Sequence, residues 1–470
     1  MIFVPEFILV FAAIVLVFSK NILKKDNWIP AAALAALGLA FLWRLGTAGQ
    51  EASLGDFFVF NNFSWYFDLI YLAVAMASVI FSFSISKDRN IFFSLMLIGT
   101  AGMMLLTKSR DILALFLSIE LIALSLYSLV AFGKSARGGS AFGGEENRLE
   151  GGIKFFVLNV FASALLILGL GIIFALTGAT QFAEISANFA PSDALPMLAG
   201  IVFILAGLGF KMGIFPFNFW LPDVYEAAPI GITALLAGAS KKAAFGAVAL
   251  LLVLGLGGLV SFWAGLFTLL AVGTLLFGHL GAIWQSNFRR FLAYSIIGQS
   301  GFMMMGLAVP SALGLTGLLF HILTHALAII GIFAIMAFLE AKGIFEIHAL
   351  DGLGKRSPFL AVALTIFLAS LGGVPLLAGF VSKFVLLSAA ISMGLVMLAV
   401  FAVLASIISI FFYFKIVRSM FAGKTQAKPL EVPILTYIIV SMPLIPIFLL
   451  GIFPGQVIGF LSQTVNYIII

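Results

Sequence analysis

The chain of 470 residues contains no cysteine and few charged residues. The absence of cysteine excludes disulfides, thiolate metal sites, iron–sulfur clusters and cysteine nucleophiles. Charged residues make up 9% of the chain, against roughly 25% in a soluble domain, so the chain cannot cover a soluble surface with charge. With 63% hydrophobic residues and a mean hydropathy of +1.22, it is predicted to be an integral membrane protein.

Motifs that bind nucleotides or cofactors are missing as well. There is no P-loop, so ATP does not drive this chain directly, and there is no GxGxxG motif in a strand-to-helix context. The four histidines lack a convincing axial pair for haem: His279, His321, His325 and His348. We therefore expect no bound cofactor, no metal and no catalytic residue in this chain. The net charge of +6 is typical of lysine and arginine in cytoplasmic loops and does not point to nucleic acid.

Long apolar runs dominate what is present. A spanning helix needs about 20 apolar residues, and about fourteen segments meet that criterion. Their approximate centres are Ala13, Leu37, Ala75, Leu97, Leu121, Leu165, Leu205, Ala243, Thr268, Met303, Ile329, Ala369, Ser406 and Pro443. The first segment is followed by "KNILKK" rather than a small-residue cleavage site, so we expect it to be retained. No soluble domain fits between the segments, which predicts an all-α polytopic membrane protein without strands.

The loop charges predict the orientation of the chain in the cytoplasmic (inner) membrane. If the N-terminus lies outside, the outer side holds Arg44, Lys108 and Arg110. The inner loops then hold Lys20, Lys24, Lys25, Lys87, Arg89, Lys134, Arg137, Arg148, Arg289, Arg290, Lys342, Lys355, Arg356, Lys415, Arg418, Lys424 and Lys428. Because positive charge gathers on the cytoplasmic side, this asymmetry places the N-terminus and the C-terminus outside.

Two segments are too long for simple spans, and each contains a proline. Residues 196–226 include "GIFPFNFWLP", with Gly213 and Pro216, and residues 357–393 include "GGVPLLAGF", with Gly372 and Pro375. Proline removes a helical hydrogen bond and clashes with the preceding turn. A break of this kind persists in lipid only inside protein or beside water. An ordinary proline kink is the alternative.

The two breaks fall in the seventh and twelfth segments, five segments apart. A five-helix unit reverses its orientation on each copy, so this spacing indicates two inverted five-helix repeats, segments four to eight and nine to thirteen. In transporters, paired broken helices mark an ion path near the bilayer midplane. We expect the first four helices in residues 1–108, the repeats in 90–256 and 257–421, and a C-terminal helix in 422–470.

Five charged residues are predicted to lie inside apolar segments, where a charge costs roughly 2.5–3.5 kcal/mol on insertion scales. They are Glu120, Lys211, Lys241, Lys242 and Lys383. Lys211 precedes the first break and Lys383 follows the second, where broken helix ends admit water. A carboxylate and several lysines around two broken helices indicate a row of protonatable groups that carries protons.

Static roles are the alternative for each of these charges. A lysine near a helix end can extend its ammonium group to the interface, most readily Lys242, which points about 100° away from Lys241 around the helix. Glu120 can instead form a structural ion pair.

Other polar residues can extend the row. Glu150 and Lys154 lie four residues apart at the cytoplasmic start of the sixth segment, on one helix face. His321 and His325 share a face of the eleventh segment; without a third ligand they favour a hydrated proton path over a metal site, with helix packing as the alternative. Gln299 can be a polar link or an interhelical contact.

Four longer stretches carry a family resemblance. They are "FKMGIFPFNFWLPDVYEAAP", "ASKKAAF", "RRFLAYSIIGQSGFMMMGL" and "LASLGGVPLLAGFVSKF". They resemble the antiporter-like subunits of respiratory complex I, which also occur in related archaeal respiratory and hydrogenase complexes and in multisubunit sodium/proton antiporters of the Mrp type. The resemblance runs from about the fourth segment to the thirteenth, most of the chain.

Within that family the chain is most similar to the N-type subunit. The sequence ends after the fourteenth segment, without the long lateral helix of the L-type subunit. The L- and M-type pattern also has a lysine soon after the "THAL" histidine, whereas here Ala328, Ile329 and Ile330 follow Leu327.

The resemblance implies roles for single positions. Glu120 matches the family glutamate that pairs with the lysine of the seventh segment, here Lys211. Lys241 matches the lysine of the eighth segment, and Lys383 matches the residue of the twelfth segment that communicates with the outside. The acidic and basic positions near the cytoplasmic entrance are matched by Glu150 and Lys154. The family performs no redox chemistry itself, because electron transfer happens in partner subunits.

These observations predict a non-redox, proton-translocating subunit of a complex I-like membrane oxidoreductase. Its expected partners are other membrane subunits, the lipid bilayer, and protons or Na⁺. A subunit of a multisubunit Na⁺/H⁺ antiporter without a redox partner is the alternative. A structural membrane scaffold with static charge pairs is the third possibility.

Overall fold

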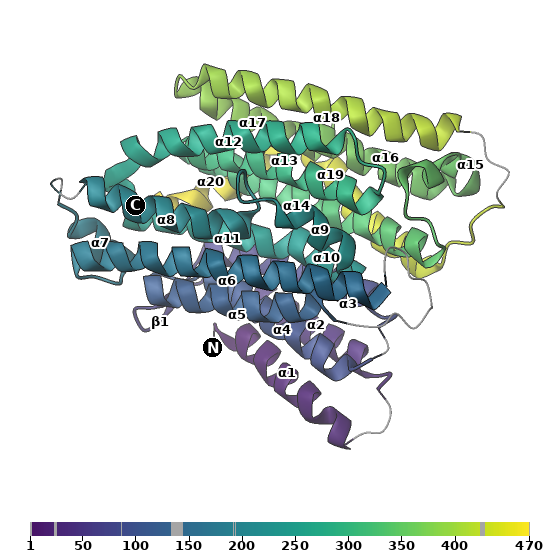
Figure 1. Ribbon diagram of the computed structural model, residues 1–470, viewed down its shortest axis with the longest axis horizontal. Helices are drawn as coiled ribbons and strands as arrows, with labels where there is room; N and C mark the ends of the chain where they lie inside the picture. Colours follow the sequence, from purple (N-terminus) through teal and green to yellow (C-terminus); the bar gives the residue numbers. More distant parts are fainter. Residues whose placement is uncertain are drawn as a thin grey trace.

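The helices of the chain run alongside one another in a single bundle, with α1 at one edge and α18 at the opposite edge (Figure 1). The computed structural model describes residues 2–22, 26–85, 87–132, 144–190, 192, 194–423 and 428–469. Five of the charges assigned to inner loops lie outside these ranges: Lys24, Lys25, Lys134, Arg137 and Lys424.

The N-terminal region contains three helices and one small hairpin. These elements are α1 (Val4–Ile22), α2 (Ile29–Leu45), β1 (Ala52–Leu54), β2 (Phe58–Phe60) and α3 (Asn62–Phe81). The two strands pair in antiparallel fashion, with Ser53 opposite Val59. The expectation that the chain has no strands was therefore wrong at this connection.

The region of the first predicted repeat contains the first broken helix. Its elements are α4 (Arg89–Leu106), α5 (Ile112–Val130), α6 (Gly144–Thr177), α7 (Phe182–Ala187), α8 (Ala194–Met212), α9 (Trp220–Ala227), α10 (Ile230–Leu235) and α11 (Lys241–Leu250). Two π-helical turns flank α11, namely η2 (Leu236–Ser240) and η3 (Leu251–Gly255).

The remainder of the chain contains the second broken helix and two C-terminal helices. Its elements are η4 (Gly257–Leu259), α12 (Val260–Ala282), α13 (Phe288–Ala308), α14 (Ala312–Ala341), η5 (Ile347–Leu350), α15 (Leu353–Arg356), α16 (Pro358–Gly372), α17 (Ala378–Ser392), α18 (Val396–Ala422), α19 (Ile434–Ile452) and α20 (Gly455–Ile469). Where one C-terminal helix was expected in residues 422–470, the structure has two, α19 and α20.

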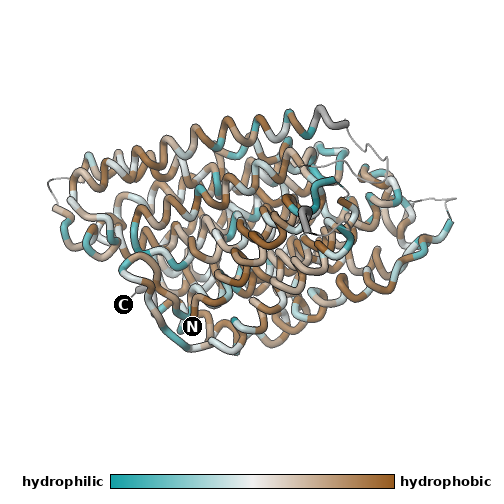
Figure 2. The backbone as a smooth tube through the Cα atoms, turned by 90° about the horizontal axis from the view of Figure 1, so that it is seen from below, coloured by the Kyte–Doolittle hydropathy of each residue, from teal (hydrophilic) through white to brown (hydrophobic). Residues whose placement is uncertain are grey.

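Length and hydropathy make the bundle suited to a membrane. Among the described residues, 11 helices are long and apolar enough to cross a bilayer, and α1, α2, α16 and α17 are shorter apolar helices. Every predicted segment centre lies within a helix, and the all-α polytopic class is confirmed. Figure 2 shows hydrophobic residues along the helices and hydrophilic residues gathered near the ends of the bundle.

The most enclosed helices form the centre of the bundle. The helix α13, the run from α10 to η3, and α14 are largely buried by their neighbours, whereas α6, α12, α18 and α19 expose most of their length. The exposed faces are apolar, as expected for surfaces that contact lipid or other membrane proteins. The central helices carry Lys241, Lys242, Gln299, His321 and His325.

Side-chain caps fix where several helices begin. The Asp111 carboxylate accepts hydrogen bonds from the amides of Leu113 and Ala114 and thereby starts α5. Asn61 caps α3, and the Ser64 hydroxyl accepts a hydrogen bond from the Asn61 amide in return. Such caps satisfy backbone donors that would otherwise have no partner in the first helical turn.

Both breaks have a glycine in the left-handed conformation directly after the first half-helix. Gly213 follows α8 with φ of +64°, and Gly373 follows α16 with φ of +87°. In the second break the left-handed residue is thus Gly373, while Gly372 is the last residue of α16. Pro216 and Pro375 lie in the connections, where they cannot donate a backbone hydrogen bond.

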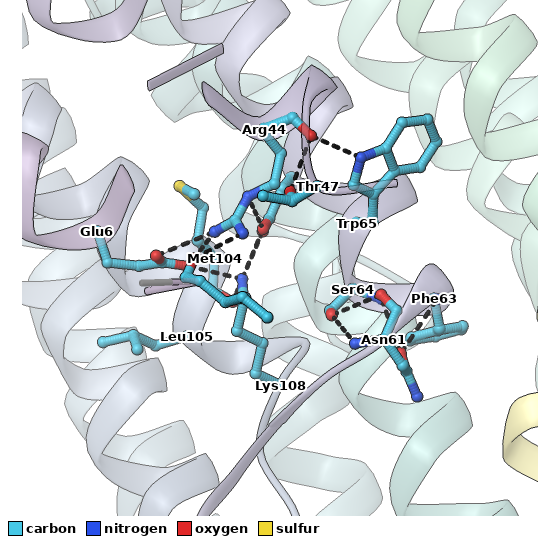
Figure 3. A network of polar contacts seen from close by, with 12 residues as sticks. Glu6, Arg44, Thr47, Asn61, Phe63, Ser64, Trp65, Met104, Leu105 and Lys108 are labelled. Atoms are coloured by element: carbon cyan, nitrogen blue, oxygen red, sulfur yellow. Dashed lines mark hydrogen bonds and ion pairs between the residues drawn. The ribbon is translucent and has the colours of Figure 1, made fainter. Parts of the chain in front are cut away.

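Four buried charges join the first four helices: Glu6 of α1, Arg44 of α2, Asp68 of α3, and Lys108 just after α4. Figure 3 labels three of them, Glu6, Arg44 and Lys108, which point toward one another. Arg44 lies 2.8 Å from Glu6 and 2.9 Å from Asp68. Lys108 lies 2.8 Å from Glu6 and 2.7 Å from Asp68. Each side chain is at most 6% exposed, and the two negative charges balance the two positive ones.

The neutral cluster contains two of the three charges that the sequence predicts for the outer side. Arg44 and Lys108, counted at the outer side, are fully buried ion-pair partners rather than loop charges. Arg110, the third outer charge, lies between α4 and α5, and burial lowers the pKa of its guanidinium to about 10. It therefore stays charged at neutral pH.

Charge balance in the cluster is testable with one single and one double variant. We expect Asp68→Asn to destabilise the protein by about 3–5 kcal/mol, because it leaves an uncompensated buried positive charge. Asp68→Asn combined with Lys108→Met keeps the remaining Glu6–Arg44 pair neutral and should destabilise less. Thermal unfolding of the purified protein measures both, and equal losses would contradict a role for charge balance.

Candidate functional site: a line of buried polar groups

The side chains of Glu120 and Lys211 face each other from two different helices. Glu120 lies in the middle of α5, and Lys211 lies in the last turn of α8, just before the first break. The Lys211 Nζ is 4.0 Å from the Glu120 Oε1, and the side chains are 12% and 25% exposed, respectively. The two charges attract each other, but at this distance they form no direct hydrogen bond.

Two polar residues of α6 fill the space between them. The Ser163 hydroxyl donates a hydrogen bond of 2.5 Å to the Glu120 carboxylate and accepts one of 3.2 Å from the Lys211 ammonium. Lys211 also donates to the side-chain oxygen of Asn159. Asn159 and Ser163 lie four residues apart and therefore share one helix face. Neither was predicted from the sequence, where each is one polar residue in a long apolar run.

A small cavity lies on the other side of Lys211. It has a volume of about 30 Å³, which leaves room for about two water molecules. Lys211, Lys241, Asn159 and Ser240 supply its polar groups. Its apolar walls include Phe155, Phe210 and Trp220, whose rings stack on one another. The first two lysines of the predicted row thus line the same cavity.

Lys241 is the first residue after the π-helical turn η2 and is almost completely buried. Its Nζ has no hydrogen-bond partner among the described residues. The side chain packs against Gly213 in the first break: a Cβ added there would lie 2.8 Å from the Lys241 Nζ. The break therefore provides the room that Lys241 occupies.

Lys242 is buried as well and does not extend to the membrane interface. Its Nζ lies 2.8 Å from the His325 Nδ1 and donates to the Ala237 carbonyl inside η2. The interface position considered for Lys242 is therefore wrong, because the side chain is buried and His325 of α14 supplies an imidazole as a partner. Through His325, Lys242 connects α11 to α14.

The histidines continue the line toward the second break. The rings of His321 and His325 are 6.3 Å apart, and the His321 Nδ1 lies 3.0 Å from the Ser382 hydroxyl. Ser382 directly precedes Lys383 on α17. Within the described part of the chain, no three histidine, aspartate or glutamate side chains are grouped so as to hold a metal ion.

Lys383 sits at the carboxyl end of the half-helix α16. Its ammonium donates to the carbonyls of Leu371 and Gly372 at 2.8 and 3.2 Å, and to the Ser406 hydroxyl at 3.3 Å. It also lies over the Phe302 ring, 4.3 Å from the centroid. Free carbonyls and the negative end of the helix dipole favour a cation here.

Gln299 contacts the same backbone group as Lys383. Its amide nitrogen donates to the Leu371 carbonyl at 3.1 Å, and its side chain is fully buried in α13. Gln299 thus shares with Lys383 a carbonyl acceptor of the second break.

Ion pairs surround the short helix α9. Lys154 lies 2.7 Å from Glu150 and 3.6 Å from Asp223, and Asp223 in turn lies 2.7 Å from Arg290. Lys154 and Glu150 are about half exposed, so this network is open to its surroundings. Asp223 of the "LPDVY" stretch thus joins α6, through Lys154, to α13, through Arg290. No spacing in the sequence predicted these two contacts.

Comparison with known proteins shows the family. The profile described as NADH:quinone oxidoreductase/Mrp antiporter, TM, matches residues 109–409, which include the whole line from Glu120 to Lys383. The chain belongs to this family. NADH-quinone oxidoreductase subunit N 1 of Herpetosiphon aurantiacus is 34% identical, covering 96% of this chain and 93% of the relative. Subunit N of Nitrosomonas europaea is 36% identical, covering 85% and 83%.

Chains of solved membrane complexes share the fold. A chain of respiratory complex I from Thermus thermophilus matches with a TM-score of 0.82 and 28% identity, covering 97% of this chain and 98% of that one. A chain of the archaeal membrane-bound sulfane sulfur reductase matches with a TM-score of 0.88 and 24% identity, covering 99% and 97%. At that identity the second match shows the fold alone.

The contact between the first break and Lys241 can be tested at Gly213. We expect Gly213→Ala to destabilise the break, since a left-handed conformation costs an alanine about 1–2 kcal/mol. The added methyl group would also lie 2.6 Å from Leu221 and 2.8 Å from the Lys241 ammonium, displacing the lysine. Proton transport by the assembled complex should fall. Gly265→Ala in α12 is the control, because no atom lies within 4 Å of its added methyl group.

Proposed function

We propose that this chain is a proton-translocating subunit of a complex I-like membrane oxidoreductase, coupled to redox chemistry in partner subunits. The observation that carries the proposal is the line of buried polar groups across both broken helices. It runs from Glu120 through Lys211, the cavity and Lys241 to Lys242 and His325, and then to His321, Ser382 and Lys383. Its relatives named as subunit N of NADH-quinone oxidoreductase support the same function.

Coulomb attraction between Glu120 and Lys211 supplies the switch. Two unit charges 4.0 Å apart interact by about 4 kcal/mol at an effective dielectric constant near 20. When Glu120 is protonated or drawn away, Lys211 loses this stabilisation and passes a proton across the cavity to Lys241. The proton then moves through Lys242 and the histidines to Lys383 and leaves on the outer side.

The position of Glu120 explains why partner subunits matter. Its side chain lies on the same exposed stripe of α5 as Leu117 and Leu124. A carboxylate that faces hydrocarbon is costly, so a neighbouring membrane subunit is expected to cover this stripe. A partner in that place can change the charge beside Glu120, which is how redox chemistry elsewhere would reach the line.

The proposal includes a location in the inner membrane and an orientation with both termini outside. The excess of lysine and arginine in the loops on one side supports an N-terminus and a C-terminus outside the inner membrane. The half-exposed network around Glu150 and Lys154 then lies on the cytoplasmic side, where protons enter. The alternative function, a subunit of a Na⁺/H⁺ antiporter, is supported only by a shared fold. The chain of the Mrp complex that matches is 20% identical to this chain.

Single replacements in the assembled complex test this function. In vesicles that contain the complex, we expect Lys211→Ala and Glu120→Ala to lower the number of protons moved per electron, because each removes one charge of the switch. The control is Lys342→Ala, an exposed lysine at the end of α14. Unchanged proton transport in both variants would contradict the proposal. Unchanged transport in the charge-neutral double variant Glu120→Gln/Lys211→Met would indicate a static scaffold.

A further inference from the structure

We propose that Asn159 and Ser163 of α6 form a two-position acceptor site between which the Lys211 ammonium moves during each transport cycle. The inference rests on the proposed function and assigns the positioning residues of its switch. Both side chains hydrogen-bond Lys211 directly, and both are almost completely buried.

The first position lies beside the carboxylate. There the Ser163 hydroxyl donates to Glu120 and accepts from Lys211, so it bridges two charges that do not touch. A hydroxyl can do this because it carries one donor and two acceptor sites. The bridge keeps the ammonium close enough to respond to the charge of Glu120 without forming a direct, more persistent ion pair.

The second position lies at the cavity. Asn159 lines the cavity together with Lys211 and Lys241, whereas Ser163 and Glu120 do not. Its side-chain oxygen, one helical turn from Ser163, accepts from the Lys211 ammonium. An ammonium that leaves Ser163 therefore keeps an acceptor while it turns toward Lys241. The structure contains both contacts at once, so both acceptors lie within reach of the same ammonium.

The chemistry of the two acceptor oxygens allows the Lys211 ammonium to move between them. Amide and hydroxyl oxygens are neutral, so they solvate an ammonium more weakly than a carboxylate does. The charge of Glu120 can then decide which position is occupied. A carboxylate at residue 159 would instead hold the ammonium at the cavity regardless of Glu120.

Replacements of Asn159 in the assembled complex test the inference, with protons moved per electron and redox turnover measured in vesicles. We expect Asn159→Asp, which keeps size and shape, to lower the proton-to-electron ratio as far as Lys211→Ala does, within about a factor of two. We expect Asn159→Leu to lower the proton-to-electron ratio to the same extent. Asn159→Gln keeps the amide, so it should lower the ratio less than Asn159→Asp and Asn159→Leu do. Redox turnover of each variant shows that the complex has assembled.

The matched control is Ser118→Ala, a buried hydroxyl of α5 that bonds only the Ala114 carbonyl among its described partners. It should leave the ratio unchanged, whereas Ser163→Ala should lower it. A normal ratio in Asn159→Asp would overturn the inference, because a merely structural asparagine tolerates its isostere. If Asn159→Leu does not assemble, Asn159→Asp and Asn159→Gln decide. A normal ratio in Lys211→Ala would instead overturn the proposed function.

Discussion

The free energy of a bare charge among apolar helices constrains where the ionic side chains of this protein lie. Glu6, Arg44, Asp68 and Lys108 neutralise one another at one end of the first four helices. Lys383 is surrounded by carbonyls, a hydroxyl and an aromatic ring. Among the described residues, the buried Lys241 ammonium has no hydrogen-bond partner, and it lines a cavity large enough for water.

The two breaks hold their lysines in different ways, and this difference suits different tasks. Lys211 is held by the side chains of Asn159 and Ser163, which can rotate. Lys383 is held mainly by the backbone carbonyls of Leu371 and Gly372, which the end of α16 fixes in place. In the proposed function, Lys211 can therefore shift in response to a neighbouring charge, whereas Lys383 keeps a constant position.

Much of the fold follows from composition and spacing. Apolar runs of spanning length locate the helices, and glycine and proline locate the connections between α8 and α9 and between α16 and α17. The roles of the charged residues are less visible in the sequence. Lys242 could be assigned to a helix face only if the π-helical turn η2 and the packing of α14 were known, because both determine where its side chain meets His325.

The polar partners were the hardest to predict. Asn159 and Ser163 give no periodic signal in α6, and isolated polar residues in membrane helices often serve packing alone. The neutral cluster joins residues as distant as Glu6 and Lys108, and charges near helix ends look like loop charges in the sequence. What identifies these residues is contact between helices, which neither composition nor local spacing contains.

The arrangement of the neutral cluster also bears on how the chain enters the membrane. Arg44 and Glu6 belong to the helical hairpin of α1 and α2, and Lys108 and Asp68 belong to that of α3 and α4. Each hairpin therefore contributes one charge of each sign to the cluster, and these two charges can pair within the hairpin as it is inserted. The contacts of Arg44 with Asp68 and of Lys108 with Glu6 then form when the two hairpins meet. Biogenesis can thus proceed hairpin by hairpin, with each charge of the cluster already paired before the two hairpins meet.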